Sequence, residues 1–75
     1  MPTLQVFPKS RVVMFFRDHP PPHVHIQFSD GRNCIVELET LNIIGKISDR
    51  EIRDALNWIE IERKFLNSEW QRCNS

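Results

Sequence analysis

Residues 18–28, DHPPPHVHIQF, contain all three histidines of the chain and three of its five prolines. After the prolines, polar and apolar side chains alternate strictly, which is the pattern of a half-buried β-strand. The two sides of this strand would be His23, His25 and Gln27 on one, and Val24, Ile26 and Phe28 on the other. We expect the apolar side to face the core, so both imidazoles should point away from it together.

The prolines that precede this strand, residues 20–22, hold the backbone φ at about −65° and favour extended geometry at the residue before each of them. They predict a stiff strut with His19 at its far end. Because a strand advances about 3.3 Å per residue, the Cβ atoms of His23 and His25 should lie about 7 Å apart. The two rings would then be close enough to converge on one ion, phosphate or water.

A hairpin is predicted directly after the histidine strand, at the Asp30-Gly31 dipeptide. Residues 33–39 would return antiparallel to it, and their expected core positions are Cys34, Val36 and Leu38. Residues 41–47 would form a fourth short strand or a loop.

The residues before the prolines also favour strands. Residues 11–17, RVVMFFR, are apolar on both faces and rich in strand-forming types, which predicts a central strand. Residues 4–7, just before Pro8, predict a short first strand or an extended arm.

A helix is predicted from residue 49, because Ser48 and Glu51 have the spacing of a capping box. Its apolar stripe would cover the sheet and consists of Ile52, Ala55, Leu56, Ile59, Leu66 and Trp70. A helix reaching residue 72 would be about 36 Å long, against about 20 Å for a six-residue strand, so it should overhang the sheet or break near residues 67–68. We predict a single domain over residues 1–75 of class α+β: a small antiparallel sheet of three to four strands with one C-terminal helix packed on one face.

A second apolar cluster on this helix, Trp58, Ile61 and Phe65, is offset from the stripe by about a third of a turn or more. One sheet covers only one side of a helix, so two interpretations stay open. The cluster packs against the N-terminal arm or residues 41–47, or it is an exposed interface for a second subunit or a partner protein.

The composition limits the classes of partner. Ten basic residues balance ten acidic ones without a run of like charge, so nucleic acid is expected only as a substrate at a local site. No stretch approaches the roughly 18 apolar residues of a membrane span, and no secretory signal is present, which predicts a cytoplasmic protein without membrane contact. Cys34 and Cys73 are expected to be free thiols. A chain of this size buries only about 60% of its unfolded surface, so a homodimer would help to stabilise it.

Five parts of the chain together match a known pattern. The opening MPT, FRDH at residues 16–19, PPHVH at residues 21–25, GKISDR at residues 45–50 and the WI pair at residues 58–59 resemble the small bacterial proteins of the domain-of-unknown-function 4160 family. The similarity spans essentially the whole chain. It departs from the family pattern at Val24, where an aromatic residue is common, and at Phe28-Ser29, where a tyrosine-glycine pair is common.

This resemblance implies that Asp18, His19, His23 and His25 form the site. It also implies a partner, because such proteins are typically encoded beside a second small family, domain of unknown function 2442, in arrangements that look like toxin–antitoxin pairs. The present chain would be the toxin-like member of a bacterial two-gene module, and its partner a small antitoxin-like protein. Neither the residues nor the resemblance decides whether the chain is an enzyme.

The chemistry of the histidines admits two active roles. In the first, His19, His23 and His25, with Asp18, are catalytic residues for RNA cleavage by acid–base chemistry, with Arg17, Arg32 or Lys46 neutralising the phosphate. In the second, His19, His23 and His25 bind a divalent metal such as zinc, with Asp18 as a carboxylate ligand.

In a third interpretation these residues have a structural or interfacial role and take part in no reaction. Asp18 would cap a turn, His19 would bond to the backbone, and the other two histidines would form a polar patch for a partner. The chain would then be a non-enzymatic protein-binding or transcriptional regulatory module.

Overall fold

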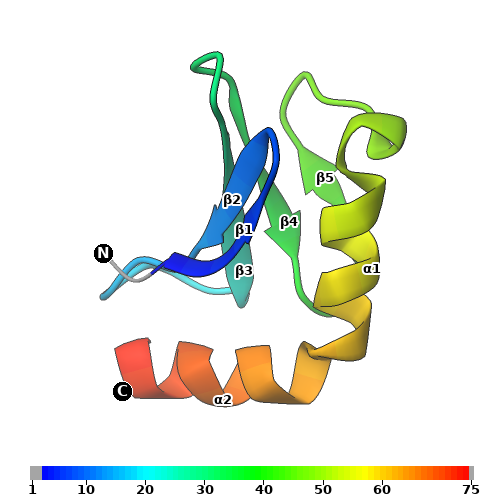
Figure 1. Cartoon of the computed structure of the whole chain (residues 1–75). Coiled ribbons are helices and arrows are strands. Elements are labelled where there is room, and N and C mark those ends of the chain that lie inside the picture. Colours follow the sequence, from blue (N-terminus) through cyan, green and yellow to red (C-terminus); the bar gives the residue numbers. More distant parts are fainter. Residues whose placement is uncertain (1–2, 75) are drawn as a thin grey trace.

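The computed structural model describes residues 3–74. Figure 1 shows an antiparallel sheet in which each strand pairs with its sequence neighbours, in the order β1 (Thr3–Phe7), β2 (Ser10–Val13), β3 (His23–Phe28), β4 (Asn33–Glu37) and β5 (Ile43–Ile44). A short 3-10 helix, η1 (Asp49–Ile52), leads into α1 (Arg53–Ile61) and α2 (Arg63–Asn74). The predicted α+β class is confirmed, with five strands instead of three to four and two helices instead of one.

The central strand is β3, and its alternation decides which face of the sheet meets the core. Val24 and Ile26 are fully buried, and their partners Val36 and Cys34 on β4 continue the same buried face. The hairpin between these strands turns at the predicted dipeptide, where Gly31 has a φ of 96° that residues with a side chain rarely adopt. The predicted core side of both strands is therefore confirmed.

The strand predicted over residues 11–17 is shorter than expected. It ends at Val13; Met14 is still fully buried, but Phe16 is 61% exposed and Arg17 has a left-handed φ of 56°. The backbone amide of Arg17 donates to the carbonyl of Cys73 at 3.2 Å instead of joining the sheet. The segment leaves the sheet because it turns toward the end of α2.

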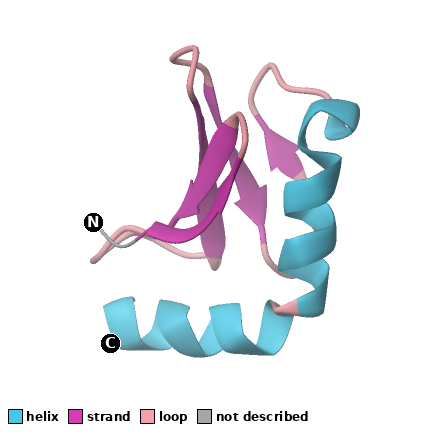
Figure 2. Ribbon diagram, viewed as in Figure 1, coloured by secondary structure: helices cyan, strands magenta, loops and turns pink. Residues whose placement is uncertain are grey.

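The predicted helix begins where expected, but it breaks earlier. The carboxylate of Glu51 accepts the backbone N–H of Ser48 at 3.0 Å, as a capping box requires. The break lies at Glu62, not near residues 67–68, and Figure 2 shows α2 turning away from α1 to pass across one end of the sheet. In a straight helix the polar residues Glu62 and Arg63 would continue the apolar stripe one turn beyond Ile59. Because the helix breaks at Glu62, these two polar residues no longer continue the stripe. The apolar side of α2, which contains Leu66 and Trp70, then packs against the core.

The core is built from the predicted stripe and the inner face of the sheet. The buried members of the stripe are Ile52, Ala55, Ile59, Leu66 and Trp70, and Leu56 packs against them partly exposed. Cys34 and Cys73 are both free, as predicted, and both are buried, although only Cys34 was expected in the core. No helix within residues 3–74 is long and apolar enough to cross a lipid bilayer.

The three residues of the second apolar cluster differ in how much of their side chains is exposed. Trp58 is half-buried and packs against the core, whereas Ile61 is 78% exposed and Phe65 is 45% exposed. Ile61 lies just before the break at Glu62 and Phe65 just after it, so both lie near the corner between α1 and α2.

Candidate functional site

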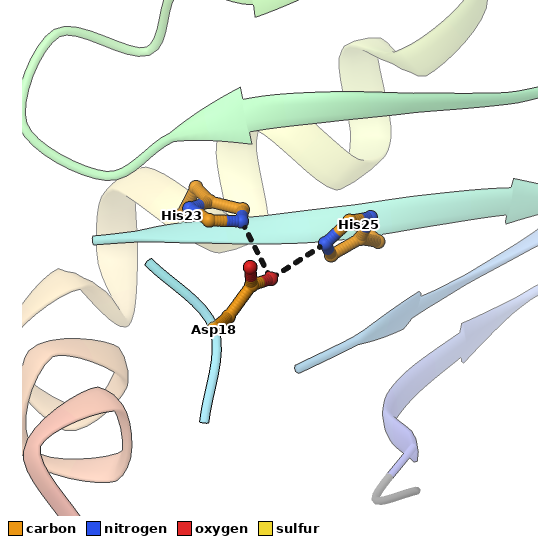
Figure 3. A group of neighbouring side chains, drawn as sticks. All are labelled: Asp18, His23 and His25. Carbon is orange, nitrogen blue, oxygen red and sulfur yellow. Dashed lines mark hydrogen bonds and ion pairs between the residues drawn. The ribbon is translucent and has the colours of Figure 1, made fainter. Parts of the chain in front are cut away.

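The segment that contains the prolines turns the chain back on itself. Five residues of extended polyproline would place Asp18 about 15 Å from His23. Instead, Oδ2 of Asp18 lies 2.8 Å from Nε2 of His23 and 3.1 Å from Nε2 of His25 (Figure 3). The prediction of a straight strut is therefore wrong: the segment is a turn, with a cis peptide bond between Pro20 and Pro21.

The two strand histidines share one face, as their spacing predicts, and their ring centroids lie 5.1 Å apart. His25 is half-buried, and its ring meets the edge of Phe15 at a centroid distance of 4.4 Å. His23 is only 6% exposed, because the ring of Trp70 lies 4.9 Å from its own. The expectation that both rings point out to solvent is corrected for His23: α2 passes across this end of the sheet and covers it.

His23 is held at both ring nitrogens. Its Nδ1 lies 2.7 Å from the carbonyl oxygen of Pro21, which only accepts hydrogen bonds, so Nδ1 must carry a hydrogen. In a neutral ring, Nε2 then has a lone pair, and this lone pair faces the carboxylate of Asp18. These two atoms can therefore share a proton or bind a metal ion together.

Asp18 is ionised at neutral pH. Partial burial raises the pKa of its carboxyl group, but hydrogen bonds from His25, from the backbone amide of His19 and from His23 together outweigh this and hold the pKa below the usual aspartate value. The carboxylate therefore offers a negatively charged oxygen to whatever the two imidazoles bind.

His19 lies beside the cluster instead of within it. Its backbone N–H donates to Oδ1 of Asp18 at 2.9 Å, and its Nδ1 lies 3.3 Å from the same oxygen. Its side chain is 89% exposed. Among residues 3–74, the side chains whose ligand atoms all lie within 4.8 Å of one another are Asp18, His23 and His25. The predicted four-residue site thus consists of three converging groups and one histidine at the solvent edge.

Two contacts of the site were missed at the sequence level. Trp70 was assigned to the core stripe, and its contact with His23 depends on the break at Glu62. The polar residues Glu62 and Arg63 within the stripe are the signal that could have located this break. The carbonyl of Pro21 could not be assigned either, since the backbone carries no residue-specific signal.

Arg32, one of the three cations considered for neutralising a phosphate, is bound elsewhere. It lies on the β3–β4 hairpin, about 16 Å along the strand from His23. Its guanidinium contacts Asp30 at 2.9 Å and Glu51 at 2.7 Å, and it lies over the ring of Phe28. Arg32 therefore fastens the hairpin to η1 and has no contact with the histidines.

Residues 10–71 match a family model described as a domain of unknown function, DUF4160. This match includes β2 to β5, the three converging side chains and Trp70. No curated protein and no solved structure gives a significant match.

Proposed function

Because the chain belongs to the DUF4160 family, which is defined as a domain of unknown function, we propose its role from the site alone: it binds a divalent metal ion through Asp18, His23 and His25. One observation carries this proposal. Two imidazole Nε2 atoms face the same carboxylate oxygen at 2.8 and 3.1 Å, and the other nitrogen of His23 is already committed to a carbonyl. This is the arrangement by which a backbone carbonyl orients a metal-ligating histidine.

Zinc fits the donor set best. Two imidazole nitrogens and one carboxylate oxygen suit a borderline ion, and catalytic zinc sites use three protein ligands of these types. Ligand atoms about 2.1 Å from a tetrahedral ion lie about 3.4 Å from one another. The present separations of 2.8 and 3.1 Å would have to open by about 0.6 and about 0.3 Å to reach this value.

The three groups leave one side of the site accessible. His23 is the buried anchor, while the side chains of Asp18 and His25 keep 17% and 22% of their surface exposed. A fourth ligand would therefore be water or a bound molecule arriving from the solvent side. His19 lies at this edge and interacts with Oδ1, which leaves Oδ2 as the oxygen that faces the two imidazoles.

Metal-free acid–base cleavage of RNA is less well supported. An acid–base catalyst needs a ring nitrogen within reach of the substrate, whereas both nitrogens of His23 are engaged and the ring is buried. The role as a toxin-like member of a bacterial two-gene module, and the alternative of a protein-binding or transcriptional regulatory module, stay predictions. Growth of bacteria that express the chain with and without its neighbouring gene, and with alanine at His19, His23 or His25, tests the toxin role.

The metal proposal is tested by titrating chelator-treated protein with zinc in a calorimeter. We expect one zinc per chain, loss of binding in His25→Ala, and nearly unchanged binding in His19→Ala. Both variants remove one imidazole from the same string, so they form a matched pair. Absence of binding by the unmodified chain at micromolar zinc would reject the proposal, and equal losses in the two variants would reject the three-residue site.

A further inference from the structure

A concave surface lies at the end of the sheet opposite to Asp18. It is a groove of about 530 Å³ between the β1–β2 and β3–β4 hairpins, which point the same way in Figure 1. The amide of Ser29 donates to the carbonyl of Lys9 at 3.0 Å and joins the two hairpins. The groove has the volume of ordinary small-molecule sites, which measure about 300 to 1,000 Å³.

The charged side chains that line this groove are all basic. Among the described residues that line it, Lys9, Arg11 and Arg32 are basic and none is acidic. Arg32 is neutralised by Asp30 and Glu51, but Lys9 and Arg11 take part in no ion pair within residues 3–74. Both of these side chains are exposed. The groove therefore presents two uncompensated positive charges to an anion.

The carboxamide side chains beside these cations indicate which kind of anion the groove would bind. Nε of Arg11 donates to Oε1 of Gln27 at 2.9 Å, which holds the guanidinium in place while its terminal nitrogens stay available. Asn33 is paired with Gln27 in the sheet register, so Arg11, Gln27 and Asn33 form one row across three strands. Carboxamides pair with the hydrogen-bonding edges of nucleobases, and Arg and Lys bind phosphates.

We propose that this groove binds a nucleoside phosphate unit of a single-stranded nucleic acid. Cations for the phosphate and amides for base edges are side-chain types that such sites combine. The site is independent of metal binding, but it shares a sheet face with the metal site: Gln27 follows His25 by two residues, about 7 Å along β3. A strand held by the groove can thus continue toward Asp18.

The test measures fluorescence anisotropy of a labelled single-stranded RNA of about ten nucleotides, a length within the usual site size, with the full chain at low salt. The double variant Lys9→Ala/Arg11→Ala should bind about fivefold to tenfold more weakly, and its salt dependence should fall by about 1.4 in log–log slope, since each lost phosphate contact contributes about 0.7. The control is Arg53→Ala/Lys64→Ala, which removes the same charge from exposed positions outside the groove. Circular dichroism confirms that each variant folds.

Two competitors identify the ligand. Displacement of the RNA by a mononucleotide supports the groove as a nucleotide site, and displacement only by an unlabelled oligonucleotide supports it as a single-strand site. The proposal is overturned if the unmodified chain does not bind the RNA. It is also overturned if both double variants lose affinity equally, or if polyglutamate displaces the RNA as well as an oligonucleotide does.

Discussion

The ring of Trp70, on the last helix, lies 4.9 Å from the ring of His23, the first residue of the central strand. This contact explains why a polar side chain at the end of the central strand is only 6% exposed. It also means that the position of α2 and the orientation of a proposed metal ligand depend on each other. Site and fold can therefore be probed with the same substitutions.

Replacing Trp70 with phenylalanine should affect both properties. Trp70→Phe removes part of a side chain that is 7% exposed, so the free energy of unfolding should fall by about 1–2 kcal/mol. Zinc affinity should fall by about tenfold, since His23 loses part of the packing that orients it. Trp58→Phe is the control, because Trp58 lies outside the site. Denaturant unfolding and calorimetry measure the two effects, and equal zinc affinities in both variants would show that Trp70 does not position His23.

Zinc should raise the melting temperature of the unmodified chain. At a free zinc concentration 100 times the dissociation constant, binding adds about 2.7 kcal/mol, or about 10 to 20 °C for a domain of this size. His25→Gln should abolish this shift, while its melting temperature without zinc stays close to that of the unmodified chain, because the glutamine amide can still donate to Asp18. If the histidines were only structural, the unmodified chain would show no zinc-dependent shift.

The lowered pKa of Asp18 predicts how stability without metal depends on pH. Since folding lowers the pKa of this group, its contribution is fully present above the unfolded value of about 3.9 and is lost as the pH falls through the folded value. The difference in unfolding free energy between the unmodified chain and Asp18→Asn should therefore be largest near neutral pH and shrink in acid. Asp30 and Glu51 also have lowered pKa values, but both residues are present in the two proteins. Their contributions to the pH dependence therefore cancel in this difference. A difference that grows on acidification would contradict the assignment.

Gly45 should tolerate alanine less well than Gly31. Both have a positive φ, of 139° and 96° respectively, so an added side chain strains the backbone at either position. At Gly45 the new Cβ would also lie 3.0 Å from Cβ of Cys34, whereas nothing lies within 4 Å of it at Gly31. We expect about 1 kcal/mol lost for Gly31→Ala and about 2 to 3 kcal/mol for Gly45→Ala, measured by urea unfolding. Similar losses would show that Cys34 moves aside.

The exposed pair Ile61 and Phe65 should contribute to association more than to stability. The double variant Ile61→Lys/Phe65→Ser should change the free energy of unfolding by less than about 1 kcal/mol, since neither side chain belongs to the core. If a second copy of the chain or a partner protein binds at this corner, size-exclusion chromatography of the variant should show the complex lost. A complex that survives the double substitution would place the interface elsewhere.

The residues of the site were predictable, but their contacts were not. The spacing of His23 and His25 predicts that they share a sheet face, and the family resemblance implies that Asp18 and His19 belong to the same site. Which of these neighbours joins the cluster depends on the direction of the turn at residues 20–22. That turn brings the Asp18 carboxylate to both imidazoles and leaves the His19 ring in solvent.

By itself, the sequence determined the features that depend on short local patterns. A period of two placed Val24 and Ile26 inside, the Asp30-Gly31 dipeptide placed the hairpin, and the capping box placed the start of the helical segment. Each depends on residues only a few positions apart, so its signal lies within one stretch of chain. Tertiary structure alone decided the direction that α2 takes after the break and what covers His23. Both follow from fitting the apolar side of α2 against the end of a sheet that distant residues build, and no local pattern contains that fit.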